Sequence, residues 1–114
     1  MKSVTVIAIT GHPATGKTSL AKSLSRVLHL PLLDKDSIKE TLADVLGWSD
    51  YAWSRKLSRA TMSLLYMLSE RLASSGVDHI LEANFDPQYA DVHWHRLVSR
   101  NPIRVIQVLS LIHI

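Results

Sequence analysis

The chain has 114 residues, of which 46% are hydrophobic and 20% charged, with 4 Gly, 4 Pro and no Cys. This composition excludes a disordered chain, and the absence of an apolar run near the roughly 20 residues of a membrane span argues against a membrane protein. Without Cys there are no disulfides, thiolate nucleophiles or cysteine-based zinc sites, which fits a cytoplasmic protein. The net charge of +3 suits an anionic ligand but does not by itself predict nucleic-acid binding.

Apolar runs of strand length alternate with helical patterns along the chain. The expected strands cover residues 4–9, 31–34, 79–83 and 103–109. The expected helices cover residues 17–29, 38–46, 51–75 and 86–100. Strands separated by helices are typical of βαβ crossovers, so we expect one α/β domain with a mainly parallel sheet.

Each of the first three expected helices carries an apolar stripe at helical spacing. The stripes are Leu20, Leu24, Val27 and Leu28, then Ile38, Leu42, Val45 and Leu46, then Leu57, Leu64, Leu68 and Leu72. The first stripe is expected to cover the sheet. At the start of the second helix, Ser37 is followed three residues later by Glu40, which predicts a capping box.

A complete phosphate-loop motif, G-x-x-x-x-G-K-[ST], follows the first strand directly. Its glycines let successive backbone N–H groups turn toward phosphate oxygens, and the helix that begins near Lys17 adds its positive end. Lys17 is expected to reach the β- and γ-phosphates of ATP, and Thr18 to bind Mg²⁺. The alternative is a glycine-containing turn whose lysine only starts a helix. The candidate nucleotide-binding residues are Gly11, His12, Pro13, Ala14, Thr15, Gly16, Lys17, Thr18 and Ser19.

Two further segments accompany the loop, LLDKD at residues 32–36 and ILEANF at residues 80–85. With them, residues 4–109 resemble the P-loop kinase-like "AAA domain" ATP-binding proteins, a group similar to zeta toxins, polynucleotide kinases and small-molecule phosphotransferases. The resemblance implies a P-loop NTPase fold of three αβα layers with ATP and Mg²⁺ as cofactors. It also implies transfer of the ATP γ-phosphate to a hydroxyl of a small molecule or a nucleic-acid end.

Three carboxylates are candidates for the chemistry. Asp34 and Asp36 follow the second strand, at the edge where open α/β sheets place ligands. In the resembling families an aspartate here is the substrate-side base, and their pattern matches Asp36, Ile38 and Lys39. We therefore expect Asp36 to be the base, supported by Asp34; the alternative is that Asp36 only favours the helix start. Glu82 is expected to hold Mg²⁺ or orient a nucleophile, the alternative being a solvated acid at a strand end.

Three other pairs admit a functional role but fit a structural one better. The pairs are Arg55 and Arg59, Trp48 and Trp53, and His93 and His95. The arginines share a helix face, either as a site for an anionic substrate or as a solvated surface. The tryptophans are expected to pack rather than to stack on a substrate. The histidines point to different sides of their helix, which argues against zinc.

The leading hypothesis is an ATP-dependent kinase with an unknown hydroxyl-bearing acceptor. The alternatives are a nucleotide-binding ATPase or regulatory switch, and an inactive fragment. Residues 1–109 are expected to form one P-loop kinase-like domain that lacks a C-terminal strand and an arginine-bearing lid. Residues 110–114 are expected to be a non-native tail.

Overall fold

The computed structural model describes residues 3–11, 16–84 and 103–109. The strands are β1 (Val4–Thr10), β2 (Leu32–Asp34), β3 (His79–Glu82) and β4 (Ile103–Leu109). The helices are α1 (Lys17–Leu28), α2 (Lys35–Leu46) and α3 (Tyr51–Ser74). These elements lie within about three residues of the ends expected for them. The helix expected at 86–100 and the tail at 110–114 lie outside the described residues.

The strands form one parallel sheet in the order β2-β3-β1-β4, which confirms the expected parallel arrangement. In the centre, Ile7 of β1 is the register partner of Ile80 in β3 and of Ile106 in β4. Because the strands are parallel, their carboxyl ends meet at one edge of the sheet. At that edge, Asp34 of β2 is the register partner of Glu82 in β3.

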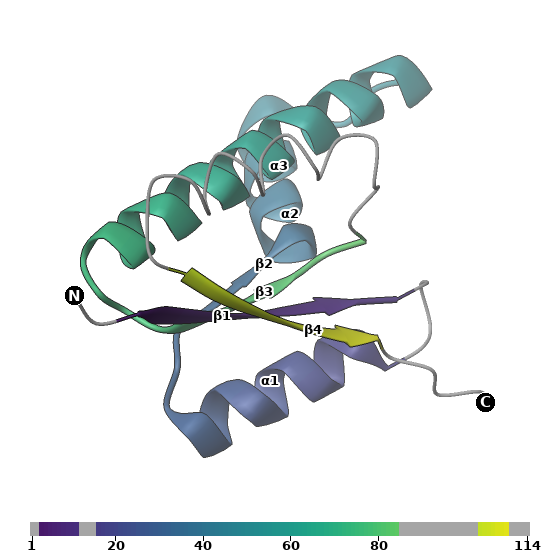
Figure 1. Ribbon diagram of the computed structural model, residues 1–114. Coiled ribbons are helices and arrows are strands. Elements are labelled where there is room, and N and C mark those ends of the chain that lie inside the picture. The colour runs from purple at the N-terminus through teal and green to yellow at the C-terminus, as the bar shows by residue number, and fades with distance from the viewer. Residues whose placement is uncertain (1–2, 12–15, 85–102, 110–114) are drawn as a thin grey trace.

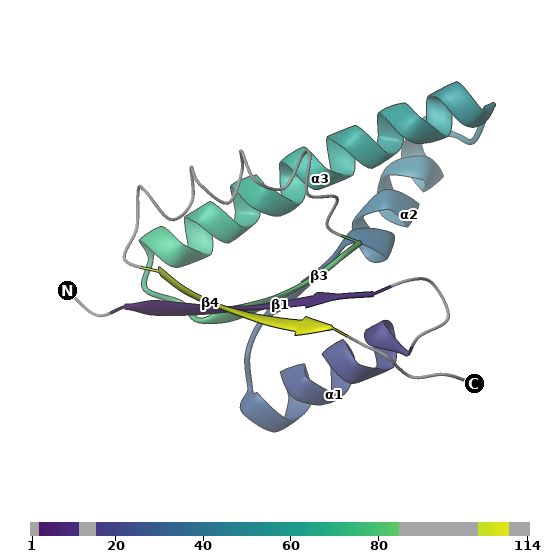
Figure 2. The same ribbon diagram turned by 45° about the vertical axis from the view of Figure 1, so that its right-hand side comes forward.

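Helices cover both faces of the sheet, as Figures 1 and 2 show from two directions. Helix α1 lies on one face, while α2 and α3 lie on the other. The result is the expected arrangement of three layers, with the sheet between two helical layers. Loops at the carboxyl edge therefore connect to helices on opposite faces, and residues from both helical layers can meet there.

The core alternates along the central strands, because successive side chains of a strand point to opposite faces. On the α3 side, Val6 and Ala8 are buried in a cluster with Leu65. On the α1 side, Ile9 is buried with Ala21. Both faces of β1 are thus covered, which explains its nearly continuous apolar sequence.

The apolar stripes predicted on the first two helices are wrong at their C-terminal ends. Val27 and Leu28 of α1 are exposed, and so are Val45 and Leu46 of α2. From the earlier turns of these helices, Leu20, Leu24 and Ile38 pack against the two core clusters. Helical periodicity indicates which face is apolar, but not how far along the helix the sheet extends.

The buried face of α3 also differs from the predicted leucine stripe. It follows an interval of four residues: Leu57, Thr61, Leu65, Ser69 and Ala73. Two of these residues are polar and have hydrogen-bond partners: the Thr61 hydroxyl donates to the Leu57 carbonyl (2.7 Å), and Ser69 Oγ lies 2.6 Å from His79 Nε2. Polar residues with internal partners can be buried at little cost, so this face could not be found from hydrophobicity alone.

The predicted capping box at Ser37 is wrong, because α2 begins earlier, at Lys35. The N-cap is Asp34, whose Oδ2 accepts a hydrogen bond from the Ser37 backbone N–H at 3.0 Å. Aspartate is among the preferred N-cap residues, and its charge also favours the positive end of the helix. The helix therefore follows β2 without an intervening loop, which places Lys35 and Asp36 in its first turn.

A buried histidine connects β3 to α3. The Nδ1 of His79 lies 2.8 Å from the Val77 carbonyl, and its Nε2 lies 2.6 Å from Ser69 Oγ. Since a carbonyl only accepts, Nδ1 carries the proton of the neutral ring and Nε2 accepts from the serine hydroxyl. Burial lowers the pKa of His79, against smaller opposing effects of the Val77 carbonyl and the Asp78 carboxylate.

The lowered pKa of His79 predicts that acid destabilises the fold. Below about pH 6.5 this histidine is protonated in the unfolded chain but still neutral in the folded chain. The free energy of unfolding therefore falls as the pH is lowered, until the pH reaches the pKa of His79 in the folded state. Urea unfolding at about pH 7.5 and about pH 5.5 measures the effect. His79→Gln should show a smaller loss than the wild type, whereas His29→Gln, at an exposed position, should not. Equal losses in all three proteins would contradict the prediction.

Candidate nucleotide-binding and transfer site

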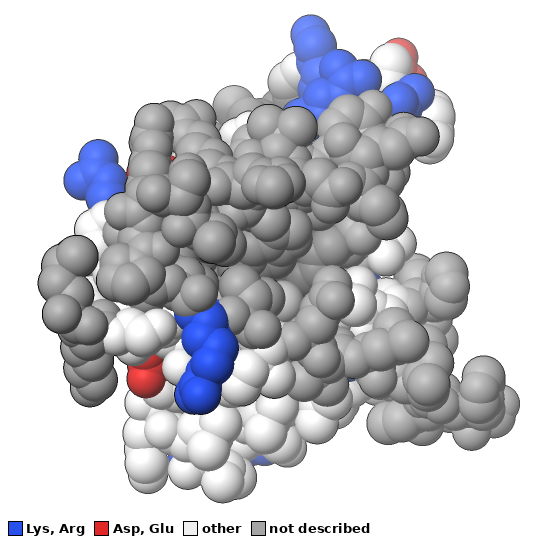
Figure 3. Space-filling view, viewed as in Figure 1, with Lys and Arg blue, Asp and Glu red and all other residues white. Residues whose placement is uncertain are grey.

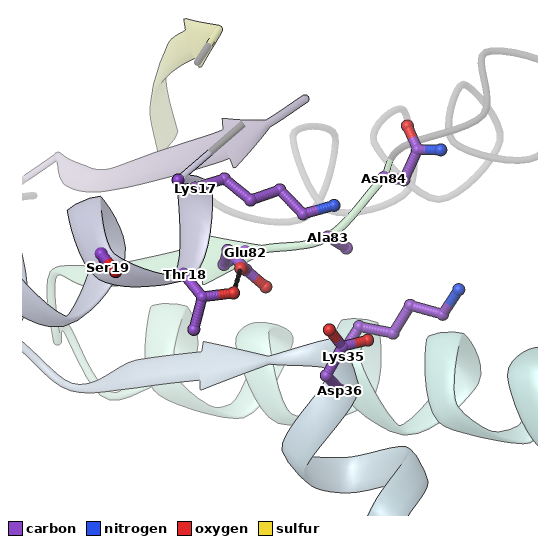
Figure 4. A pocket seen from close by; sticks show the side chains of 9 residues that line it. Lys17, Thr18, Ser19, Lys35, Asp36, Glu82, Ala83 and Asn84 are labelled. Carbon is purple, nitrogen blue, oxygen red and sulfur yellow. Dashed lines mark hydrogen bonds between the residues drawn. The ribbon is translucent and has the colours of Figure 1, made fainter. Parts of the chain in front are cut away.

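A pocket of about 420 Å³ lies at the carboxyl edge of the sheet. Three segments contribute to it: the start of α1, the start of α2 and the end of β3 with the two residues after it. Figure 4 shows the side chains of these segments around the same space. The lining residues are Gly16, Lys17, Thr18, Ser19, Lys35, Asp36, Glu82, Ala83 and Asn84. The pocket thus brings together most of the described residues that the sequence predicted for the site.

The first segment is the end of the phosphate-loop motif. Gly16 has φ 77° and ψ 12°, a left-handed conformation that glycine adopts without steric cost, and it is the N-cap of α1. No side chain caps this helix, whereas Asp34 caps α2 and Asp50 caps α3. The first N–H groups of α1 are therefore left without a side-chain cap at the pocket, and the helix dipole favours an anion there.

Lys17, the first residue of α1, links the two ends of the loop. Its Nζ donates a hydrogen bond to the Gly11 carbonyl, at the end of β1, over 2.9 Å. An ammonium group has three donors, so this contact leaves two for a ligand. The remaining loop residues, His12, Pro13, Ala14 and Thr15, lie outside the described residues.

Thr18 and Glu82 meet at the wall of the pocket. The Thr18 hydroxyl donates to Glu82 Oε1 over 2.7 Å, as the dashed line in Figure 4 marks. Glu82 is only 1% exposed, so it is not the solvated strand-end acid that the sequence left open. A buried carboxylate needs a hydrogen-bonding or cationic partner. A hydroxyl and a carboxylate oxygen are thus held together beside the end of α1.

The two aspartates at the start of α2, Asp34 and Asp36, differ in whether they reach the pocket. Asp36 is exposed and lines the pocket, whereas Asp34 caps α2 and is not among the lining residues. Lys39, which matches the families' basic position, donates to Ser54 Oγ of α3 over 2.9 Å. Of these three residues, only Asp36 therefore reaches the pocket.

Lys35 is a pocket residue that the sequence reasoning missed. It is partly buried, and burial lowers its pKa; the charge of Lys39 lowers the pKa further, Asp36 opposes this, and Lys17 adds a smaller lowering effect. The sequence did hold an indication of its place in the site, since Lys35 stands between two aspartates at the carboxyl end of a strand. Its significance depends on α2 beginning at Lys35 rather than at Ser37.

The three residue pairs for which the sequence favoured a structural role either do not line the pocket or lie outside the described residues. Arg55 and Arg59 are exposed on α3, and Figure 3 shows basic side chains at the end of the molecule where α3 begins. Arg55 lies over the Tyr51 ring at 6.0 Å. The Trp53 indole N–H donates to the Gly47 carbonyl at 2.8 Å, as expected of a packing role, whereas Trp48 is 62% exposed. Neither arginine nor either tryptophan lines the pocket; His93 and His95 are not described.

The described residues contain neither a cluster of metal-ligating side chains nor a helix suited to a membrane. In residues 3–11, 16–84 and 103–109, no group of three or more His, Asp or Glu side chains could hold a metal ion. Within the same ranges, no helix has the length and apolar character needed to cross a membrane.

Comparisons with curated proteins find kinases. Over 42 residues the chain is 48% identical to the cytidylate kinase of Pyrobaculum islandicum, covering 37% of this chain and 23% of that protein. Over 91 residues it is 32% identical to the shikimate kinase of Syntrophus aciditrophicus, covering 75% of this chain and 45% of that protein. The chain thus spans less than half the length of these relatives. No family model matches it.

Two solved structures share the fold. A protein from Chloroflexus aurantiacus J-10-fl, described provisionally as a kinase, is 39% identical with a TM-score of 0.94, over 97% of this chain and 61% of that one. A sugar kinase from Janibacter sp. HTCC2649 is 16% identical with a TM-score of 0.56, over 94% and 60% of the two chains. Together with the curated relatives, these similarities give the chain a P-loop kinase-like fold.

Proposed function

We propose that this chain forms the nucleotide site of an ATP-dependent kinase that transfers the γ-phosphate of ATP to a hydroxyl group. The observation that carries the proposal is the pocket itself. It joins the uncapped start of α1, with Lys17 and Thr18, to the buried Glu82 on one side and to Asp36 on the other. Phosphoryl transfer needs a phosphate site, a metal site and a carboxylate that accepts the acceptor's proton.

The start of α1 supplies the phosphate site in this proposal. Its N–H groups would donate to phosphate oxygens, and Lys17 would direct its two remaining donors to the β- and γ-phosphates. Ser19 follows in the same first turn and also lines the pocket. ATP is proposed as the nucleotide because the motif and the two accompanying segments resemble those of ATP-binding proteins.

Thr18 and Glu82 fit a Mg²⁺ ion. Magnesium takes oxygen ligands, commonly one or two carboxylates together with substrate phosphates. The hydrogen bond from Thr18 Oγ1 to Glu82 Oε1 holds one hydroxyl and one carboxylate oxygen side by side at the pocket wall. When bound, the ion would neutralise charge on the β- and γ-phosphates. In the families that the sequence resembles the acid at this strand end is usually Asp; here Glu82 accepts directly from Thr18.

Asp36 would act as the base. The acceptor's hydroxyl oxygen forms a bond to the γ-phosphorus while the bond between that phosphorus and the β,γ-bridging oxygen breaks and ADP leaves. The hydroxyl proton passes to the Asp36 carboxylate, which lines the pocket on the side away from α1. Asp34 supports this residue indirectly, because it caps the helix on which Asp36 lies.

The finer assignment to the P-loop kinase-like "AAA domain" group is also part of the proposal. It is supported by the segments LLDKD and ILEANF, whose residues Asp36 and Asn84 both line the pocket. A cytoplasmic location is supported by the absence of Cys.

An acceptor panel tests the proposed function. The protein is incubated with Mg²⁺ and ATP alone, and then with sugars, nucleosides, hydroxy acids, 5′-hydroxyl oligonucleotides, shikimate or cytidylate. One class of hydroxyl compound should stimulate ADP release and yield a product heavier by one phosphate group. ADP release that is the same with every acceptor would instead indicate an ATPase. Transfer to the phosphate of cytidylate alone would contradict a hydroxyl acceptor.

A further inference from the structure

Two lysines, Lys17 and Lys35, line the pocket, and Lys39 lies close enough to Lys35 to lower its pKa. Lys17 donates to the Gly11 carbonyl and Lys39 donates to Ser54 Oγ, each over 2.9 Å. Lys35 lines the pocket but makes no hydrogen bond or ion pair with any residue in the described part of the chain. A partly buried ammonium group without a partner loses hydration and gains little in return.

Lys17 and Lys35 reach the same pocket from opposite faces of the sheet. Lys17 begins α1, which lies on one face, and Lys35 begins α2, which lies on the other. In Figure 4 the two side chains extend toward the same side, where Asn84 also lies. Their charges oppose each other, since Lys17 is among the groups that lower the pKa of Lys35. An oxyanion between them would relieve this repulsion and supply a partner that the described residues do not give Lys35.

The position of Lys35 indicates which part of a nucleotide would supply that oxyanion. In the proposed function the phosphates extend from the start of α1 toward Asp36, so the terminal phosphoryl group comes nearest to the acceptor side. Lys35 directly precedes Asp36 in the first turn of α2. It would therefore contact the group that is transferred, while the α- and β-phosphates stay with α1.

We propose that Lys35 is a second phosphate-binding lysine, which together with Lys17 brackets the terminal phosphoryl group of a bound nucleoside triphosphate. This inference rests on the proposed function, because it presumes that the pocket holds the phosphates. Lys35 acts as a positioning residue that holds the γ-phosphoryl group in front of Asp36. Lys35 also selects for a triphosphate, because a diphosphate has no phosphoryl group at the place that Lys35 contacts.

Calorimetric titration with Mg²⁺ and either an unreactive ATP analogue or ADP tests the inference. Lys35→Met should weaken binding of the triphosphate by about tenfold, the loss of one charge-assisted contact, and should leave ADP binding within about twofold. Lys35→Arg should restore most of the preference for the triphosphate. Lys22→Met is the matched control, since it removes one exposed lysine of α1 outside the pocket and should change neither affinity. Lys35→Gln repeats the test if the methionine variant does not fold.

Two results would overturn the inference while leaving the proposed function intact. One is a Lys35→Met protein whose affinities for the triphosphate and the diphosphate are both unchanged. This holds also if the variant raises the KM for the acceptor, because Lys35 would then contact the acceptor instead. The other is equal weakening for triphosphate and diphosphate. A wild-type protein that binds neither nucleotide would overturn the proposed function and this inference together.

Discussion

Asp36→Asn is expected to lower phosphoryl transfer by about 10²- to 10⁴-fold while leaving the affinity for Mg²⁺-ATP nearly unchanged. Asparagine preserves the size and polarity of the side chain in the first turn of α2, but it cannot accept the acceptor's proton. Nucleotide affinity should not depend on this residue, because the proposed phosphate contacts come from α1 and from Lys35. Single-turnover transfer to the best acceptor of the panel, together with calorimetric titration of nucleotide, measures both quantities.

Asp44→Asn is the matched control for this variant. Asp44 is an exposed acid on the same helix and does not line the pocket, so its replacement changes the net charge equally. Transfer at the wild-type rate in Asp36→Asn would contradict the role as base. Asp36 would then only favour the N-terminus of α2, as an acidic residue in the first turn does.

Lys17→Ala is expected to weaken Mg²⁺-ATP binding by about tenfold to a hundredfold. The variant removes a cation facing the β- and γ-phosphates, and a charge-assisted contact contributes about 1.5–3 kcal/mol. It also removes the hydrogen bond to the Gly11 carbonyl, which joins the end of β1 to the start of α1. Thermal unfolding of the variant therefore accompanies the calorimetric titration, to separate a lost ligand contact from a loosened loop.

Lys22→Ala provides the comparison for Lys17→Ala, because it removes an exposed lysine from the same helix. It should bind ATP as the wild type does. Equal ATP affinity in Lys17→Ala and the wild type would contradict the proposal that residues 11–18 bind the phosphates. A weakened affinity for ADP in Lys17→Ala is also expected, which distinguishes this lysine from Lys35.

The parts of the fold that local chemistry determines could be predicted from the sequence. The run Val4–Ile9 is apolar on both faces because α1 and α3 cover both sides of the sheet. The phosphate-loop motif predicts the start of α1, since Gly16 adopts a left-handed conformation immediately before a helix that starts with Lys17. Both features can be recognised from residues adjacent in the chain, and the structure contains both of them.

Features that depend on distant partners were missed. Ser69 is buried because His79, ten residues further along the chain, accepts from its hydroxyl, so the contact face of α3 does not follow the leucines. At α2, Asp34 at the end of β2 caps the helix in place of Ser37, and the helix starts two residues before that serine. That shift brings Lys35 into the pocket, where a helix beginning at residue 38 would not have placed it.

The pairing of Thr18 with Glu82 illustrates the intermediate case. The sequence predicted both as metal-binding residues, but from separate arguments, a motif for one and a strand end for the other. They meet because β1 and β3 are neighbours in register, with Ile9 opposite Glu82, and α1 follows β1 through the loop. The topology of a parallel sheet therefore determined the contact, once the strand order was fixed.

A crystal structure with Mg²⁺ and a non-hydrolysable ATP analogue would show whether this one pocket holds the phosphates, the metal and the base. We expect the terminal phosphoryl group between the Nζ atoms of Lys17 and Lys35, the metal bound by Thr18 and Glu82, and the Asp36 carboxylate facing the γ-phosphorus. Phosphates bound away from the start of α1, or a metal without contact to Thr18 or Glu82, would contradict it.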